Sequence, residues 1–379
     1  MDGIAGRKPA LTWAVHLSVA LLVALWVLPT LGLFVSSFRT GDQIATSGWW
    51  RALGAQEQQL NPIRVKGQEV ARDGAFVIEG TLFDAPGATV SRWGTSSREP
   101  AAHAPGDTVD LGEGQTLRVD ADGAYVLTAT ASTAGTRLPR VFATATTPPQ
   151  FTLDNYANVL FSPLAGQSVG QAFLNTLTVA IPATVIPILI AAFAAYALAW
   201  MEFPGRALLV AAVVGLLVVP LQLALIPLLD LHNRLGIGKG YLGIWLAHTG
   251  FGLPLAIYLL RNYMVGLPRD IIECARVDGA TEFQIFTRII LPLSFPALAS
   301  FAIFQFLWTW NDLLVALVFL GTGNDQQVLT GNLVNLMGSR GGDWEILATS
   351  AFVSIFVPLV VFFSMQRFLV RGLLAGSVK

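Results

Sequence analysis

Residues 267–296 read LPRDIIECARVDGATEFQIFTRIILPLSFP, the one long polar interruption with a patterned sequence in the apolar second half of the chain. Pro268 suits the first turn of a helix, where its missing N–H costs nothing. Ile272, Ala275 and Val277 are predicted to form the apolar side of that helix, with charged residues opposite. The stretch therefore predicts a short amphipathic helix just after Pro268.

A turn and a second short helix are predicted to follow. Asp278-Gly279 is a typical turn pair, and a glycine inside a helix would cost roughly 1 kcal/mol, which also favours a break there. Thr281 and Gln284 have the spacing of a capping box, so a new helix is expected to begin at this point. The pattern predicts two short helices, roughly at right angles, lying at a membrane face beside a spanning helix.

The same stretch resembles the cytoplasmic EAA loop of ABC importer permeases, whose pattern is E-A-A-x-x-x-G followed later by I-x-L-P. The matching residues are Glu273-Cys274-Ala275, Asp278-Gly279-Ala280 and Leu291-Pro292, with cysteine in place of the middle alanine. The resemblance implies that residues 267–291 fit a cleft on an ATP-hydrolysing subunit and couple its nucleotide cycle to the membrane helices. The residues implied for this coupling are Glu273, Ala275, Asp278, Gly279, Ala280, Phe283 and Phe286. An ordinary amphipathic loop at the bilayer surface is the alternative.

Composition places the chain in a membrane and limits its chemistry. Its 379 residues are 54% hydrophobic and 12% charged, with a mean hydropathy of +0.60, which is typical of membrane proteins. The net charge of −1 argues against a nucleic-acid partner. One cysteine excludes an intramolecular disulfide, and no Cys/His cluster has metal-ligand spacing. Because the sequence contains no phosphate-binding G-x-x-x-x-G-K-[ST] loop and no Ser/His/Asp arrangement, we expect that the chain is not an enzyme and binds no cofactor, with ATP and Mg²⁺ on a partner ATPase.

Six apolar runs are long enough to cross a membrane. The first extends from Leu11 to Phe38, after Arg7 and Lys8, and exceeds the apolar core of a cleaved signal peptide, which is the alternative. The other five are residues 172–200, 206–230, 242–264, 290–320 and 346–369. Basic residues gather on the side assigned to the cytoplasm, so both termini are expected inside.

The second span carries two further patterns. Pro182 and Pro187 are predicted to interrupt it, and kinks at such prolines are expected to shape a cavity. Ala191, Ala195 and Ala199 recur every fourth residue, which lets a neighbouring helix approach closely, although alanine is also simply common in this region.

The character of the sequence changes from Thr40 to Pro149, where short alternating runs are bounded by turn signals. The predicted strands are 75–82, 116–120 and 124–129, and the predicted hairpin turns are Asp73-Gly74 and Asp122-Gly123. About a hundred residues are enough for a small β-sandwich or barrel. Since this segment follows a span with its N-terminus inside, we expect it outside the cytoplasm, where it either docks a solute-binding protein or braces a partner subunit.

Polar residues within the spans are candidates for the path of a substrate. Asn311 and Asp312 lie in WTWNDLLVALVFL of the fifth span, where a carboxylate normally faces a polar cavity or a partner. A structural hydrogen bond between helices is the alternative and the favoured one. Gln222 and Gln305 are weaker candidates for the cavity wall, and Pro220 and Pro227 are predicted to interrupt the third span.

The two flanks of the permease-like region carry further resemblances. Asn175-Thr176 resembles an Asn-Thr pair that sugar permeases have in the second span, and the tail RFLVRGLLAGSVK, residues 367–379, resembles that of MalG-type permeases. The tail resemblance implies a contact at the interface between two ATPase subunits. The tail residues implied are Arg371, Gly372, Ala375 and Gly376.

On these residues the chain resembles the MalG-type permease subunit of a carbohydrate ABC importer, over about residues 1–40 and 150–379. The segment 341–347 together with the insertion points to the α-glucoside branch. The resemblance implies an all-α polytopic membrane protein with six transmembrane helices, the ABC importer permease fold, and an inserted extracytoplasmic β-rich domain. The expected domains are 1–39, the N-terminal tail and first span; 40–150, the β-rich insertion; and 151–379, a five-helix permease core.

The implied function is translocation of a di- or oligosaccharide, an α-glucoside, delivered by a solute-binding protein and driven by ATP. The implied partners are a second, MalF-like permease, two ATPase subunits, an extracytoplasmic sugar-binding protein and membrane lipid, in a bacterial or archaeal cytoplasmic membrane. Two other classes remain as alternatives. One is a receptor or sensor with an external β ligand-binding domain, and the other is a membrane enzyme acting on lipid-linked sugars, which would need paired acidic residues at one membrane face.

Overall fold

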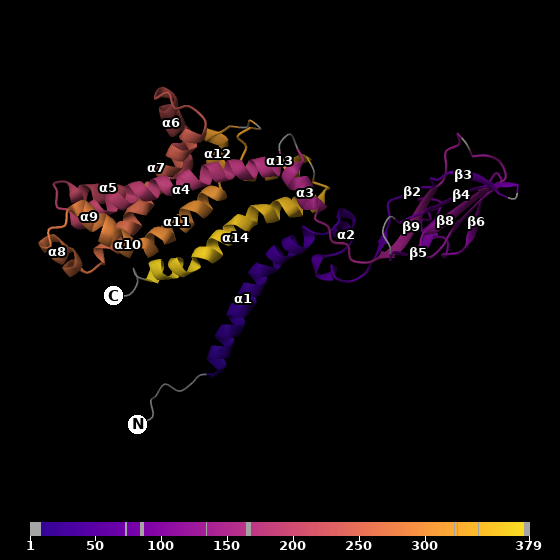
Figure 1. Ribbon diagram of the computed structural model, residues 1–379, viewed down its shortest axis with the longest axis horizontal. Helices are drawn as coiled ribbons and strands as arrows, with labels where there is room; N and C mark the ends of the chain where they lie inside the picture. Colours follow the sequence, from indigo (N-terminus) through magenta and orange to yellow (C-terminus); the bar gives the residue numbers. More distant parts are fainter. Residues whose placement is uncertain are drawn as a thin grey trace. The chain divides into compact units, whose positions relative to one another are not determined.

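The protein forms two compact units, Met1–Leu153 and Asp154–Lys379 (Figure 1). The computed structural model describes residues 9–72, 74–83, 87–133, 135–163, 168–321, 323, 325–339 and 341–374.

The first unit begins with the long apolar helix α1 (Pro9–Ser36). Residues Leu11–Ser36 are long and apolar enough to cross a membrane, as predicted for the first span. The short helices α2 (Gly41–Thr46) and η1 (Trp49–Arg51) follow. The Trp49 indole lies so close to α1 that a Cβ added at Gly32 would come within 2.7 Å of Nε1, so this junction is tightly packed.

The rest of the first unit is a β-sandwich of two antiparallel sheets. Its strands are β1 (Gln56–Gln59), β2 (Ile63–Arg64), β3 (Glu69–Arg72), β4 (Ala75–Thr81), β5 (Thr89–Gly94), β6 (Thr108–Gly112), β7 (Gln115–Val119), β8 (Ala124–Ala129) and β9 (Arg140–Thr147). In one sheet β9 pairs with β1, β2 and β5, and the other has the order β3-β4-β8-β7-β6. The three predicted strands are confirmed as β4, β7 and β8, and Gly123 occupies its turn with φ +82°. Asp73 lies outside the described residues.

Alternation of apolar and polar residues explains the sandwich. Side chains from both sheets, including Trp93 of β5, Leu117 of β7 and Tyr125 of β8, bury one shared core. The buried polar atoms find partners: Trp93 Nε1 donates to the Ala104 carbonyl at 2.9 Å, and the Tyr125 hydroxyl donates to the Lys66 carbonyl at 2.8 Å.

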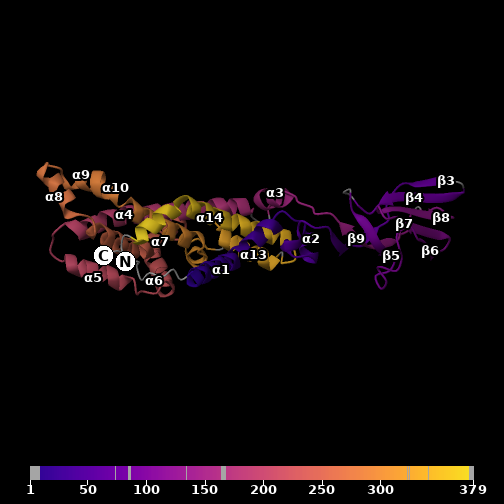
Figure 2. The same ribbon diagram turned by 90° about the horizontal axis from the view of Figure 1, so that it is seen from below.

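The second unit is helical, and it contains the patterned loop. Its elements are α3 (Asp154–Phe161), α4 (Val169–Trp200), α5 (Arg206–Leu216), α6 (Leu221–Arg234), α7 (Tyr241–Val265), α8 (Arg269–Val277), α9 (Glu282–Ile285), the π-helical turn η2 (Phe286–Ile290), α10 (Leu291–Leu293), α11 (Phe295–Trp310), α12 (Leu314–Phe319), α13 (Leu329–Ser339) and α14 (Trp344–Leu374). Both views place α8, α9 and α10 together at one end of this unit (Figures 1 and 2).

Not every predicted span is one straight helix. Among the described residues, α1, α4, α7 and α14 are long and apolar enough to cross a membrane. Two further pairs qualify only as bent spans. The helix axis bends by 110° between α5 and α6, and by 69° between Glu282–Leu293 and α11. The break before Pro220, which caps α6, confirms the interruption predicted there, whereas Pro227 lies inside α6 and does not interrupt it, so that prediction is wrong. The predicted span 290–320 is not one helix, because α11 ends at Trp310 before α12 starts.

Pro182 and Pro187 do not interrupt α4, so that expectation is also wrong. Each proline lacks an N–H and therefore frees the carbonyl four residues earlier. Trp245 Nε1 of α7 donates to the Thr178 carbonyl at 2.9 Å, and Gln305 Nε2 of α11 donates to the Ala183 carbonyl at 3.1 Å. Side chains of neighbouring helices thus replace the lost bonds, and α4 continues unbroken.

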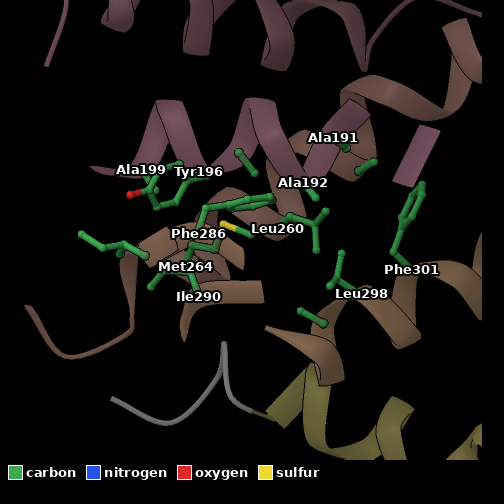
Figure 3. Packing of buried hydrophobic residues seen from close by; sticks show 14 of the residues in the cluster. Ala191, Ala192, Tyr196, Ala199, Leu260, Met264, Phe286, Ile290, Leu298 and Phe301 are labelled. Atoms are coloured by element: carbon green, nitrogen blue, oxygen red, sulfur yellow. The ribbon is translucent and has the colours of Figure 1, made fainter. Parts of the chain in front are cut away.

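The core of the second unit forms where α4 meets α7. Ala191, Ala195 and Ala199 are buried, which confirms a close-packed face of small residues on α4. Leu260 and Met264 of α7 pack in the same cluster (Figure 3). This cluster continues into the patterned loop, so the loop is anchored on the membrane helices.

Candidate coupling site

The first helix of the loop, α8, begins after Pro268, which is its N-cap. Ile272 and Ala275 are buried against the unit, as predicted. Val277 is 87% exposed, so its assignment to the apolar side is wrong. At about 100° per residue, five positions place Val277 about 140° around the helix from Ile272, away from the buried face.

The turn and the second helix form as predicted. The Asp278 N–H donates to the Cys274 carbonyl at 2.9 Å, and Gly279 takes φ +79°, the left-handed conformation that favours glycine. The capping box is complete: the Gln284 N–H donates to Thr281 Oγ1 at 3.3 Å, and the Thr281 N–H donates to Gln284 Oε1 at 2.9 Å. Local side chains therefore define this corner without help from the rest of the fold.

The helical stretch that starts at α9 is longer than the sequence indicates. It continues through η2 and α10 to Leu293, and the chain then bends into α11 at Ser294. π-helical turns are rare and occur frequently at functional sites. Phe286 and Ile290, at the two ends of η2, are both buried.

The seven residues predicted to couple the loop to an ATPase divide into two groups. Glu273, Asp278, Gly279 and Phe283 are exposed. Phe283 is 65% exposed, a large apolar side chain on the outer surface of the loop. Ala275 and Phe286 are buried and Ala280 is half-buried. The first group forms the accessible surface, and the second holds the loop against α4 and α7.

An ion pair joins the two short helices across the turn. Arg276 Nε of α8 lies 2.9 Å from Glu282 Oε1 of α9. The hydrogen bond to Glu282 raises the pKa of the Arg276 guanidinium above its usual value. The other carboxylate oxygen of Glu282 accepts a hydrogen bond from the Tyr196 hydroxyl of α4. The sequence analysis did not identify Tyr196, Arg276 or Glu282 as a group, because they are brought together only by the fold.

A polar cavity of about 510 Å³ lies beside this group. It is lined by Trp200, Met201, Glu202, Arg269, Ile272, Glu273, Arg276 and Glu282. Three helices contribute to it: the first three residues end or follow α4, the next four belong to α8, and Glu282 is the first residue of α9. The cavity carries charges of both signs and is suited to a polar or charged partner group.

The predicted path residues Asn311 and Asp312 lie between α11 and α12 instead of inside a continuous span. Asp312 Oδ2 accepts the N–H groups of Val315 at 2.9 Å and Ala316 at 3.2 Å, so its carboxylate caps α12. Asn311 is exposed, and its amide donates to the Leu307 carbonyl at 2.8 Å.

A histidine of α7 lies next to this carboxylate. His248 of α7 is fully buried, and its Nε2 lies 4.0 Å from Asp312 Oδ2. Neither ring nitrogen of His248 has a hydrogen-bond partner within the part of the chain that the structure describes.

The two glutamine candidates occupy different places. Gln222 is exposed near the start of α6. Gln305 is buried, and its amide bonds α11 to the Ala183 carbonyl of α4, so it holds helices together instead of facing an open cavity. An apolar cavity of about 550 Å³ does lie beside the break at Pro220. Leu217 and Leu221 flank the break and line this cavity with Phe251 and Trp308.

The predicted tail contact falls outside what the structure describes. Ala375 and Gly376 are not described, and for Arg371 and Gly372 only the helical backbone is described. Within the described ranges, no group of three or more His, Cys, Asp or Glu side chains could hold a metal ion.

Comparison with known proteins identifies the family. Residues 172–374 match the family described as binding-protein-dependent transport system inner membrane component. The alpha-glucoside transport system permease protein AglG of Rhizobium meliloti is 64% identical, covering 98% of each chain. The osmoprotective compounds uptake permease protein GgtD of Synechocystis sp. is 62% identical over 61% of this chain and 76% of that protein.

Solved structures are also similar, among them one of an ABC transporter. A bacterial ABC transporter involved in the import of the acidic polysaccharide alginate has a TM-score of 0.49 and 22% identity, covering 59% of this chain and 81% of that chain. The family match covers more than half of this chain, and the likeness to AglG extends through both units. The chain therefore belongs to the binding-protein-dependent transport system inner membrane components, the permease subunits of ABC transporters.

Proposed function

We propose that this chain is the transmembrane permease subunit of an ATP-driven importer of α-glucosides, translocating a di- or oligosaccharide. The observation that carries the proposal is the 64% identity to an alpha-glucoside transport permease across 98% of both chains. A likeness limited to residues 172–374 would support the family alone. Here the likeness also includes α1 and the β-sandwich, which lie outside the family match.

The proposed topology has six spans. α1, α4, α7 and α14 would cross as single helices, and the α5–α6 pair would cross as one bent span. In the second bent pair α11 would cross, and the residues before it up to Leu291 would belong to the cytoplasmic loop. The distribution of basic residues supports cytoplasmic termini and a cytoplasmic 267–291 loop. The β-sandwich within residues 40–150 would then lie outside, where it either receives a solute-binding protein or braces the second permease.

ATP hydrolysis is assigned to partner subunits. The sequence contains no phosphate-binding loop of the G-x-x-x-x-G-K-[ST] type. The exposed residues Glu273, Asp278, Gly279 and Phe283 form the surface that would enter a cleft on an ATPase, with ATP and Mg²⁺ bound there. Arg371, Gly372, Ala375 and Gly376 of the tail would contact the same subunits. Closure of the ATPase pair would then move α8 and α9 and shift the permease between two rigid-body arrangements.

The sugar path is proposed to lie mainly on the second permease subunit. The cavity at the Pro220 break in this chain is lined almost entirely by apolar side chains, whereas a sugar needs hydrogen-bonding groups as well as an aromatic surface. Asn311 and Gln222 are exposed and remain candidates for contributions from this chain. Asp312 and Gln305 are assigned to structural hydrogen bonds.

Sugar uptake tests the proposal. A strain lacking the chain should fail to accumulate a labelled α-glucoside, and the chain expressed from a plasmid should restore uptake. Unlabelled α-glucosides should compete in excess, and β-linked analogues of the same size should not. Restored uptake that both anomers inhibit equally would contradict the α-glucoside assignment, and no effect of the deletion on any sugar would contradict the importer.

A further inference from the structure

Tyr196, one helical turn before the end of α4, connects a membrane helix directly to the loop. The side chain is nearly buried, at 5% exposure, and its hydroxyl donates to Glu282 Oε2 of α9. Its ring packs on Phe286, with the centroids 5.2 Å apart. One residue thus makes a directional contact with α9 and an apolar contact with η2. Figure 3 shows Tyr196 and Phe286 in the buried cluster.

Glu282 joins three helices through one carboxylate. Oε1 accepts from Arg276 of α8, and Oε2 accepts from Tyr196 of α4, while Glu282 itself is the first residue of α9. Hydrogen bonds to a charged group are stronger than those between neutral groups. The carboxylate therefore fixes the orientation of α8 and α9 relative to the end of α4.

The end of α4 is stiff enough to carry a displacement. Its last carbonyls would lack partners in a free helix end, but Arg206 Nε donates to Leu198 O at 2.9 Å and Arg206 Nη2 donates to Ala199 O at 3.2 Å. On its other side, α4 packs through its alanine face against α7. A movement applied at Tyr196 therefore moves α4 as a body instead of fraying its end.

We propose that Tyr196 is a positioning residue through which the loop passes displacement to α4, and that the Tyr196–Glu282–Arg276 group is the directional part of this connection. The inference rests on the proposed function of the loop as the contact with an ATPase. Phe193 and Phe286, with centroids 4.7 Å apart, provide a second contact between α4 and the loop. Apolar contacts have no fixed direction, so they hold the loop on α4 but permit sliding.

The variant Tyr196→Phe removes the hydroxyl and keeps the ring against Phe286. Tyr258→Phe is the matched control, because Tyr258 lies on neighbouring α7 and has no hydrogen bond within the described residues. Each variant is purified as the complete complex with its ATPase and second permease and reconstituted in liposomes. Recovery of the ATPase, basal ATP hydrolysis, stimulation by the solute-binding protein, and sugar transported per ATP are measured.

Tyr196→Phe should recover the ATPase normally and hydrolyse ATP at the basal rate, while sugar transported per ATP falls roughly three- to tenfold. Tyr258→Phe should match the wild type in all four measurements. A Tyr196→Phe complex with wild-type transport per ATP would overturn the inference. Loss of the ATPase from Tyr196→Phe during purification would also overturn it, because the residue would then serve assembly.

A double-variant cycle keeps the test independent of folding. If the hydroxyl acts through the carboxylate, Tyr196→Phe combined with Glu282→Ala should transport no less per ATP than Glu282→Ala alone. If instead the double variant lost sugar transport per ATP by the product of the two single losses, Tyr196 and Glu282 would have independent roles. That result would overturn the proposed connection through the carboxylate. Failure of the proposed function looks different: the wild-type complex itself would then show no ATP-dependent sugar transport.

Discussion

Substitutions at Gly279 separate the backbone requirement of the turn from contact with a partner. Gly279 has φ +79°, and a residue with a Cβ costs roughly 1–2 kcal/mol in that conformation. No atom of the unit lies within 4 Å of the position that a Cβ would take. Gly279→Ala and Gly279→Arg therefore carry the same local strain, and neither clashes with the rest of the chain. An exposed substitution otherwise changes stability by about 0.5 kcal/mol or less.

The two variants should differ only when a partner covers the turn. In a packed interface the arginine would bury an unpaired charge, which costs several kcal/mol, and each 1.4 kcal/mol weakens binding about tenfold. We expect both variants to reach the membrane at equal levels and to have similar thermal stability in detergent. Gly279→Ala should retain most sugar uptake and co-purify with the ATPase, and Gly279→Arg should lose both by more than roughly tenfold.

Uptake and ATPase recovery in membranes that express each variant at matched levels measure this difference. Uptake and ATPase recovery retained equally in both variants would refute the reasoning, because the surface around Gly279 would then be free of any partner. Equal loss in both variants would also refute it, because the whole effect would then come from the backbone strain at Gly279.

Three further predictions concern other parts of the chain. Replacing Thr40–Pro149 by a short linker should lower sugar uptake while the ATPase remains bound. A short linker can close the gap, because the flanking residues Arg39 and Phe151 already pair as a β-bridge. Unchanged uptake kinetics would limit the β-sandwich to bracing a partner subunit. Asp312→Ala should lower the free energy of unfolding of the purified chain by about 1 kcal/mol, because the cap of α12 is lost. Asp312→Asn should lower it less, because asparagine keeps an acceptor oxygen. Equal losses in the two variants would contradict the capping role. Hydrogen bonds from Ser132 and Thr133 hold the pKa of the Glu69 carboxyl below its usual value in the folded protein. These bonds therefore stabilise the fold fully above the ordinary carboxyl pKa of the unfolded chain. The stabilisation is lost as the pH falls through the lowered pKa of the folded state. The unfolding midpoint of the β-sandwich should therefore differ between wild type and Glu69→Gln at neutral pH and converge at strongly acidic pH, and a constant difference would contradict this.

Local features of the loop could be predicted from sequence because they depend on near neighbours. The Thr281–Gln284 capping box closes within one turn of helix, and the left-handed residue of the turn is a glycine. Strands β4 and β8 were predictable for the same reason, since alternation of side chains is read along one strand. Val277 was misplaced because an apolar side chain alone does not decide the buried face: the helical period turns Val277 about 140° away from Ile272 on α8.

Helix breaks could be predicted only in part, because they depend on distant partners: the break at Pro220 was predicted correctly, and those predicted at Pro182, Pro187 and Pro227 are absent. Pro182 and Pro220 have the same missing N–H, yet α4 passes through the first and the chain bends by 110° before the second. The difference at Pro182 is the Trp245 indole, which bonds to the freed carbonyl of Thr178 from another helix. A proline alone therefore does not say whether a span is broken.

Contacts between side chains far apart in the sequence were missed for the same reason. Tyr196 and Glu282 are separated by 86 positions, and each is unremarkable in its own segment. His248 lies beside Asp312 only because α7 packs near the start of α12. Candidate residues chosen from motifs thus included the exposed surface of the loop and the buried Ala275 and Phe286, but omitted the polar Tyr196–Glu282–Arg276 group.

Purification of the tagged chain from its native membrane in mild detergent, with the co-purifying proteins identified by mass spectrometry, tests the central claim most directly. A permease subunit of an ATP-driven importer should bring with it an ATPase and a second permease in fixed ratio, and Gly279→Arg, purified in parallel, should lose the ATPase. Recovery of the chain alone, repeatedly and in more than one detergent, would contradict the account.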